Sequence, residues 1–307
     1  SKGLVLNDNV RNPLCFFTNS SNTIQKIDGE KGRSSYQSNR FSTHYGLEFL
    51  KSENLTIGAA FGHGTSNLNQ MSINSSSVSS KIKGGAIYSV YKPSIGLQPS
   101  SPGKTKVIGL IGYNHFDIDG TREAPPSGLI ANPTNFSADY EANGVTAALQ
   151  IEHIFTKVSN DGYLKPLIGI AYSQYDQQGF TESSSNPMNL KINSSNEERL
   201  LATFAIEVGS AKKPNEKRIA SKVRLGLETE ILRNANKTVS LDSSFEEASG
   251  LGSFTTKGQA SGRDTAFVDG EVQIKISKNS ILYTNASYTS FASGEDYSYG
   301  GGIRIAF

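Results

Sequence analysis

Few side chains in this 307-residue chain are able to do chemistry, and their spacing favours neither a catalytic nor a metal site. No two of the four histidines have the spacing of metal ligands on one helix; they are His44, His63, His115 and His153. Residues 102–105 (Pro-Gly-Lys-Thr) match half of a phosphate-binding loop, but Gln98 stands where that loop requires a glycine. The single cysteine, Cys15, can form no internal disulfide and excludes a Cys-rich zinc site. We therefore predict no catalytic residues, no metal and no other cofactor.

Charged residues alternate with apolar ones in several segments. Around Leu225 and Leu227, for example, the intervening positions are small or charged. Successive side chains of a strand point to opposite faces, so these strands have one apolar and one polar face. We predict that the charges opposite the apolar stripes form ion pairs around a hydrated pore, because a Lys or Arg facing lipid near the midplane costs about 2–4 kcal/mol. The residues predicted to line the pore are Glu48, Lys81, Lys83, Glu152, Lys165, Arg224, Glu228, Glu230, Asp269, Glu271, Lys275 and Arg304.

Composition narrows the class of protein further. The formal net charge is +2, which argues against a nucleic-acid-binding protein. Hydrophobic residues make up 36% of the chain and the mean hydropathy is −0.38, which is low for a large soluble core but fits a membrane barrel with a polar lumen. No run of 18 apolar residues is present, so no transmembrane helix is predicted. Such a chain can span a membrane only as a closed β-barrel, in which every backbone polar group is paired.

Period-two alternation recurs along nearly the whole chain, and only residues 196–210 are also compatible with a helix. Many of the predicted strands are long, whereas strands of globular proteins average about 5–6 residues. A tilted membrane strand needs about 9–11 residues. We predict about twelve strands, near residues 12–20, 36–50, 54–67, 79–92, 105–119, 137–156, 162–178, 190–210, 217–233, 263–277, 280–291 and 297–307.

The predicted connections alternate in length. Those after the second, sixth, eighth and tenth strands are short, whereas those after the first, third, fifth, seventh and ninth are longer, and residues 234–262 form the longest. Short periplasmic turns and long extracellular loops are typical of outer-membrane barrels, although the connection at 93–104 is longer than this pattern expects. We therefore predict an all-β fold, a transmembrane antiparallel up-and-down barrel of about 12 strands with both termini on the periplasmic side.

The last eleven residues alternate between an apolar, aromatic face and a face of small or charged residues. The apolar face comprises Tyr297, Tyr299, Gly301, Ile303, Ile305 and Phe307. A strand of this kind, which ends the chain on an aromatic residue and has Arg304 on its other face, resembles the C-terminal strand of bacterial outer-membrane barrels. In those proteins the terminal pattern is the signal that the outer-membrane insertion machinery reads.

Over residues 12–307 the chain resembles the translocator (β-barrel) domain of classical autotransporters, the type V secretion family. A strand at 45–49, a short polar turn and a Gly-rich strand at 54–63 look like its second hairpin. Residues 164–172, then Gly179-Phe-Thr-Glu182 and Leu190, are similar to its central Pro–Gly–Tyr strand and aromatic-x-Glu loop. The chain departs from the family in having no Trp and no evident long helix before the first strand, although Tyr and Phe can supply the interfacial girdles. The final strand matches through Tyr299, Ile303, Ile305 and Phe307.

The resemblance implies a domain of the bacterial outer membrane that supports secretion of an N-terminal passenger. Residues 12–307 would be the barrel, and residues 1–11 the remnant of the passenger that threads the pore. Because Ser1–Val5 lack the layout of a signal peptide, we expect the chain to be the C-terminal part of a longer exported precursor. The implied partners are outer-membrane lipid, the chain's own passenger and the barrel-assembly machinery, with no nucleic acid and a monomeric state. The implied assembly signal is Tyr299, Ile303, Ile305 and Phe307.

Several alternatives stay open at this point. Some family members cleave the passenger inside the barrel, for which Asn7-Asp8-Asn9 is a candidate junction; the candidate assisting carboxylates are Glu48, Glu152, Glu228 and Asp269. An independent twelve-stranded outer-membrane channel is the main alternative function. A membrane-embedded hydrolase would use His63 or His115 near the strand tops, and a soluble β-sandwich adhesin is a further class.

Overall fold

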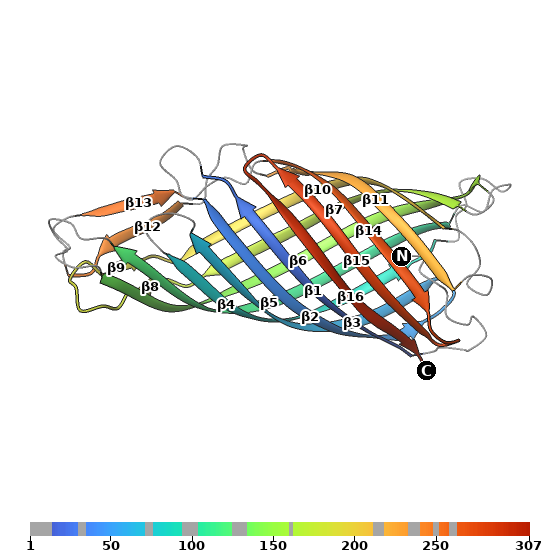
Figure 1. Ribbon diagram of the computed structural model, residues 1–307, viewed down its shortest axis with the longest axis horizontal. Helices are drawn as coiled ribbons and strands as arrows, with labels where there is room; N and C mark the ends of the chain where they lie inside the picture. Colours follow the sequence, from blue (N-terminus) through green and yellow to red (C-terminus); the bar gives the residue numbers. More distant parts are fainter. Residues whose placement is uncertain are drawn as a thin grey trace.

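The computed structural model describes residues 14–29, 35–70, 76–93, 104–124, 134–159, 162–210, 218–232, 240–247, 252–257 and 263–307. Within these residues, twelve strands form one closed antiparallel barrel in the order β1-β16-β15-β14-β11-β10-β7-β6-β5-β4-β3-β2 (Figure 1). The barrel strands are β1 (Cys15–Ile27), β2 (Tyr36–Lys51), β3 (Leu55–Gln70), β4 (Ser77–Tyr91), β5 (Lys104–Ala124), β6 (Thr134–Ser159), β7 (Gly162–Gln177), β10 (Ser195–Ser210), β11 (Ile219–Glu230), β14 (Asp264–Lys275), β15 (Ser280–Phe291) and β16 (Gly294–Ala306).

The first and last strands close the barrel. β1 pairs with β16 from Cys15↔Ala306 to Ile27↔Gly294, and it pairs with β2 along its other edge. Every barrel strand therefore has a hydrogen-bonded neighbour on both sides, and the barrel has no open edge. β1 begins and β16 ends at the same end of the barrel, the end that carries the C-terminus in Figure 1. The predicted twelve-stranded barrel is confirmed. No described helix has both the length and the apolar character that crossing a membrane requires.

The two faces of the barrel wall differ sharply in polarity. Along one register line Leu47, Ile87 and Ile111 all point outward, and the side chains of Ile87 and Ile111 are 62% and 67% exposed. On the opposite face, charged side chains such as Glu152 and Lys165 are almost completely buried. Apolar residues outside and charged residues inside are the reverse of a soluble protein, and they fit a barrel whose solvent is lipid.

Glycines on the inner face let large side chains lie flat against the wall. A Cβ atom on Gly46 would lie 2.0 Å from the ring of Phe17, the residue directly opposite on β1. A Cβ atom on Gly58 would lie 2.4 Å from the Tyr88 ring. Glycine is therefore required at both positions by close approach, and the Tyr88 hydroxyl can reach across Gly58 to donate to Glu48 Oε1 at 3.4 Å.

A second, four-stranded sheet lies beyond the barrel at the end away from the C-terminus (Figure 1). It is built from β8 (Phe180–Thr181) and β9 (Leu190–Ile192), which lie between β7 and β10, and from β12 (Ser240–Phe245) and β13 (Ser253–Lys257), which lie between β11 and β14. β9 and β12 join the two connections through Leu190↔Phe245 to Ile192↔Ser243. This sheet corrects two predictions: the strand at 190–210 is divided into β9 and β10, and the predicted loop at 234–262 contains β12 and β13.

Strand boundaries differ from the predictions mainly at the end with the second sheet. The strand predicted at 12–20 runs from Cys15 to Ile27, and those predicted at 105–119 and 137–156 extend to Ala124 and back to Thr134. At the C-terminal end of the barrel, the turn between β2 and β3 is short, as predicted. Residues 1–13, which include the predicted passenger remnant at 1–11, lie outside the described residues, as do 94–103 in the connection between β4 and β5.

Candidate functional site in the barrel lumen

Six adjacent strands each contribute one charged side chain to a single row on the inner wall, and the sign of the charge alternates from strand to strand. We call this set the charge ladder; in order from β5 to β14 it comprises Lys106, Glu152, Lys165, Glu207, Lys222 and Glu271. All six residues lie in the half of their strands nearer the C-terminal end of the barrel. Three lysines and three glutamates give the ladder no net charge.

Ion pairs connect each member of the charge ladder to the next. Glu152 accepts from both sides, with Lys106 Nζ at 3.0 Å and Lys165 Nζ at 2.9 Å. Lys165 Nζ is also 2.9 Å from Glu207 Oε1, and Lys222 Nζ lies 3.9 Å from Glu207 Oε2. Lys222 Nζ then lies 3.3 Å from Glu271 Oε2, which completes the ladder.

Strand register explains why these contacts form. Lys165 is directly opposite Glu207, and Lys222 is directly opposite Glu271, so each pair projects from neighbouring positions on the same face. The side chains of Glu152, Lys165 and Glu207 are at most 3% exposed. Charges buried to this degree must be paired, because an unpaired charge in a low dielectric is strongly unfavourable. Tyr163 adds a hydroxyl that donates to Glu207 Oε1 at 2.6 Å.

Beyond the charge ladder the same wall encloses a polar cavity of about 530 Å³. Arg224 Nε donates to Asp269 Oδ2 at 2.6 Å, and Glu228 Oε1 accepts from the Thr203 hydroxyl at 3.2 Å. These residues and the charge-ladder members Lys222 and Glu271 line the cavity together with hydroxyl and amide side chains of β15. This side of the lumen is therefore densely charged and has room for water.

The opposite wall of the lumen, from β16 through β1 to β4, is lined largely by small side chains. A hollow of about 360 Å³ is bordered there by residues that include Gly62, Gly84, Ala60 and Ala86. Arg304 also points inward, between Phe17 of β1 and Ile281 of β15 in the register. Free space in the lumen thus lies against both walls, and the charge ladder faces the wall of small residues.

Lys81 and Lys83 are on the outer wall, so the prediction that they line the lumen is wrong. Lys83 lies beside His63 and on the same face as the exposed Ile87, and its ammonium is 3.6 Å from Asp117 Oδ2. Both faces of β4 carry apolar residues, so the alternation alone does not decide which face is inside. Pairing with β3 places Tyr88 on the inner face, over Gly58. The lysines therefore point outward, at the end of β4 farther from the C-terminal end of the barrel.

The structure places the other predicted pore residues on the inner face: Glu48, Glu152, Lys165, Arg224, Glu228, Glu230, Asp269, Glu271, Lys275 and Arg304. Four further residues, Lys106, Tyr163, Glu207 and Lys222, also lie on the inner face but were not predicted from the sequence. The alternation in the sequence could have identified two of them as inward-facing, because Glu207 stands between the apolar Ile206 and Val208 and Lys222 is two residues before Arg224. Lys106 and Tyr163 stand near strand ends, where alternation is short.

Two of the four candidate carboxylates for passenger cleavage, Glu228 and Asp269, line the same polar cavity, and Asp269 is paired there with Arg224. Glu152 is held by two lysines, and Glu48 lies on a different wall. The candidate junction at Asn7 to Asn9 lies outside the described residues. Among the described residues, these carboxylates are therefore engaged by cations or hydroxyls of the inner wall.

The histidines are likewise dispersed. His44 lies on the inner face, whereas His63, His115 and His153 lie on the outer face. His115 is close to Asp117 and Glu141 on the outer wall. Asp117 pairs with His115 of the same strand at 3.1 Å and with Lys83 of the neighbouring β4, so we assign this group to ion pairing on the outer wall.

The C-terminal strand presents its apolar face to the outside. Tyr299 and Phe307 are 57% and 71% exposed, and Ile303 and Ile305 share their face of β16. The backbone N–H of Phe307 donates to the Leu14 carbonyl at 3.0 Å, which ties the last residue to the start of β1. The four predicted assembly-signal residues therefore form one continuous outward stripe at the seam of the barrel.

Comparison with known proteins identifies the fold. A family model described as the autotransporter beta-domain matches residues 16–287. The structure is similar to the translocator domain of the autotransporter NalP from Neisseria meningitidis, with a TM-score of 0.65, 14% identity and coverage of 98% of this chain and 90% of that chain. It is also similar to the beta domain of the Bordetella autotransporter BrkA, with a TM-score of 0.64, 14% identity and coverage of 97% and 100%. The transport unit of AIDA-I from Escherichia coli gives a TM-score of 0.55, 10% identity and coverage of 100% and 94%. Comparison with curated protein sequences gives no match.

Proposed function

Because the chain belongs to the autotransporter β-domain family, we propose that it sits in the bacterial outer membrane and conducts its own N-terminal passenger to the cell surface. The observation that carries the proposal is the closed twelve-stranded barrel with an apolar outer face and a charged inner wall. The outer face suits lipid, and the inner wall suits a hydrated conduit. The function is that of a transporter barrel, with the passenger as its cargo.

The charge ladder suits the passage of an unfolded polypeptide. Its alternating signs cancel, so a passing segment of either charge meets no net attraction from this wall. The ion pairs also tie six adjacent strands together near the periplasmic end, which keeps the wall rigid while a chain moves past it. The small residues of the opposite wall leave the space that a transiting segment would occupy.

The two ends of the domain have separate roles in this proposal. Residues 1–11 are the remnant of the passenger and lead into β1 at the periplasmic end. The outward stripe of β16 is the signal that the barrel-assembly machinery reads; it comprises Tyr299, Ile303, Ile305 and Phe307. Its exposure to the outside suits recognition before the barrel closes.

The test is surface display of a reporter. An epitope-tagged reporter, preceded by an export signal, is joined upstream of Ser1 and expressed in a Gram-negative host. Protease added to intact cells should degrade the reporter while the barrel remains folded and heat-modifiable. A matched version without Gly294–Ala306 cannot close the barrel and should leave the reporter undigested. A folded barrel whose reporter stays protected in intact cells would contradict the proposal.

A further inference from the structure

A group of side chains able to hold a metal ion lies on the outer wall, toward the loop end of β5 and β6. His115, Asp117 and Glu141 each offer one ligand atom, and these three atoms lie within 4.8 Å of one another. His115 and Asp117 are two residues apart on β5, and Glu141 is directly opposite Asp117 on β6. Strand pairing creates the group, so the spacing of the histidines along the chain could not reveal it.

The hydrogen bonds of the His115 ring fix the position of one proton. Nδ1 is 3.0 Å from Asn143 Oδ1, which also accepts from the Tyr113 hydroxyl at 2.5 Å. An amide oxygen can only accept, so His115 Nδ1 carries a hydrogen and donates it. The other ring nitrogen, Nε2, is 3.1 Å from Asp117 Oδ1. Metal-binding histidines are held in this way, with the second ring nitrogen donating to a fixed acceptor.

A positive charge is required between His115 Nε2 and the carboxylates. A lone pair on Nε2 would face Asp117 Oδ1, and two acceptors at this distance repel each other. Glu141 adds a second carboxylate, and like charges directly opposite each other on a sheet are destabilising. A proton on Nε2 forms the ion pair with Asp117 alone, whereas a divalent cation can satisfy all three groups at once.

The surroundings of the group also favour a cation. Lys81 and Lys83 of β4 lie beside it in the register, and Lys83 Nζ is 3.6 Å from Asp117 Oδ2, which leaves Oδ1 available. The Lys83 side chain is 64% exposed, so it can turn to solvent when a cation binds. These two ammonium groups are outnumbered by the four carboxylates of an adjoining pocket of about 300 Å³: Asp117, Asp119, Asp139 and Glu141.

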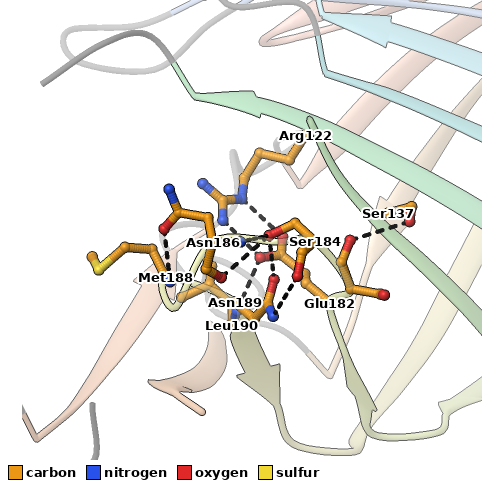
Figure 2. A network of polar contacts seen from close by, with 9 residues as sticks. Arg122, Ser137, Glu182, Ser184, Asn186, Met188, Asn189 and Leu190 are labelled. Atoms are coloured by element: carbon orange, nitrogen blue, oxygen red, sulfur yellow. Dashed lines mark hydrogen bonds and ion pairs between the residues drawn. The ribbon is translucent and has the colours of Figure 1, made fainter. Parts of the chain in front are cut away.

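The strands that carry the group are held on both sides. β5 and β6 pair without a break, and on the other edge of β6 the Glu141 carbonyl accepts the N–H of Gln178 at 3.0 Å. Farther along β5, Arg122 donates to Glu182 through Nε at 2.8 Å and Nη2 at 2.6 Å (Figure 2). The backbone under the group is therefore an interior part of a sheet, and sites built on such elements are more precise than sites on loops.

We propose that His115, Asp117 and Glu141 bind a zinc ion on the outer wall, with water as the fourth ligand. Zn²⁺ binds imidazole nitrogen and carboxylate oxygen at about 2.0–2.2 Å, which places neighbouring ligand atoms of a tetrahedron about 3.3–3.5 Å apart. The 3.1 Å between His115 Nε2 and Asp117 Oδ1 is close to this spacing, and the exposed Glu141 side chain can turn toward them. The bound ion joins β5 to β6 and replaces a like-charge contact.

The nitrogen ligand determines which metal the site prefers. Ca²⁺ and Mg²⁺ take oxygen ligands, whereas imidazole suits Zn²⁺ and its neighbours among the transition metals. His115 therefore distinguishes the site from the acidic surface around it, which can attract any cation. A test of the proposal must separate these two kinds of binding.

Zinc titration of the purified, folded barrel without a histidine tag tests the site, with a chromogenic chelator as competitor. The parent should bind zinc at least about tenfold more tightly than His115→Ala or Glu141→Gln. The matched control is His153→Ala, which removes another outer-wall histidine near the opposite end of the barrel and should leave the affinity unchanged. Equal zinc affinity of the parent and His115→Ala would overturn the proposal.

Asp139→Asn is the control for the acidic surface, because it removes a carboxylate of the same pocket that is not a proposed ligand. It should weaken zinc binding less than either ligand substitution, and Ca²⁺ at the same concentration should not displace zinc from the parent. A loss in Asp139→Asn equal to that in Glu141→Gln, or displacement by Ca²⁺, would assign the binding to the acidic surface and overturn the proposal.

Chemical protection of the parent barrel needs no variant to fold. Diethyl pyrocarbonate modifies accessible imidazole nitrogens, and mass spectrometry reports the modified fraction of each histidine. Zinc should slow the modification of His115 and leave that of His153 unchanged. Equal modification of His115 with and without zinc would overturn the site. Both measurements require only a folded barrel, so their outcome is independent of passenger transport.

Discussion

The ammonium of Lys165 lies 2.9 Å from Glu152 Oε2, although these two residues are not directly opposite each other on β7 and β6. Glu152 faces Leu167 in the register, so Lys165 reaches it diagonally. The residue directly opposite Lys165 is Glu207, whose carboxylate is also 2.9 Å away. One buried ammonium thus bridges two buried carboxylates and links three strands.

Replacing Lys165 with Met should therefore lower the free energy of unfolding by about 3–5 kcal/mol, because it leaves buried carboxylates without their shared partner. The measurement is urea unfolding of the barrel refolded into lipid. Lys83→Met is the matched control, since Lys83 is 64% exposed on the outer wall and its loss should change little. Adding Glu207→Gln to Lys165→Met should recover part of the loss. Equal stability of Lys165→Met and Lys83→Met would show that the charge ladder does not hold this wall.

The two faces of β11 should respond in opposite ways to substitution. Leu225 is 60% exposed on the outer face, and an Arg there should reduce the folded, inserted fraction, at a cost of about 2–4 kcal/mol near the midplane. Glu228 lies on the inner face, so Glu228→Leu should insert normally and alter conductance or passenger transit. The measurements are folded fraction and bilayer conductance for each variant. Normal insertion of Leu225→Arg together with failed insertion of Glu228→Leu would reverse the assignment of the faces.

Gly46 should not tolerate even a methyl group. Gly46→Ala places Cβ against the Phe17 ring and should destabilise the barrel by about 1–3 kcal/mol, the usual range for overpacking. Gly270→Ala is the control, because its Cβ would lie 3.8 Å from the nearest atom. Unfolding measurements compare the two, and Phe17→Leu combined with Gly46→Ala should restore part of the stability. A Gly46→Ala barrel as stable as the control would contradict the close approach.

Removal of Phe307 should impair assembly more than the stability of the finished barrel. Its side chain is 71% exposed, so little folded-state packing is lost, whereas the outward aromatic stripe of β16 loses its last member. Heat-modifiable barrel in outer membranes and unfolded protein in the periplasm are quantified after expression. The same variant refolded in detergent is the control and should fold. Normal outer-membrane amounts of the shortened chain would argue that Phe307 is not part of the assembly signal.

The barrel was predictable because lipid imposes one rule on every spanning strand. Alternate residues must be apolar, and strands such as β3 and β15 are long enough for this alternation to be recognised in the sequence. The rule stops at the membrane boundary. β5 and β6 are 21 and 26 residues long, and in their outer parts the apolar residues, such as Ile118 and Phe136, lie on the inner face while the outer face is polar. The predicted end of β5 is therefore too early and the predicted start of β6 too late.

Other features depended on pairing that local sequence does not encode. β8 and β9 are two and three residues long, too short for any period, and they exist because Leu190 pairs with the distant Phe245. The outward direction of Lys81 and Lys83 followed from the register between β3 and β4, in which Tyr88 is seated over Gly58. Alternation specifies that a strand has two faces, and the neighbouring strands decide which face is inside.

We propose that the barrel crosses the outer membrane with its loop end outside the cell. Single cysteines at Ser76, between β3 and β4, and at Ser52, between β2 and β3, mark the two ends of the barrel. With Cys15→Ala in both, intact cells are treated with a membrane-impermeant maleimide. We predict labelling of the cysteine at position 76 and none at position 52 until the cells are broken. Labelling at position 52 but not at position 76 in intact cells would show that the barrel has the opposite orientation.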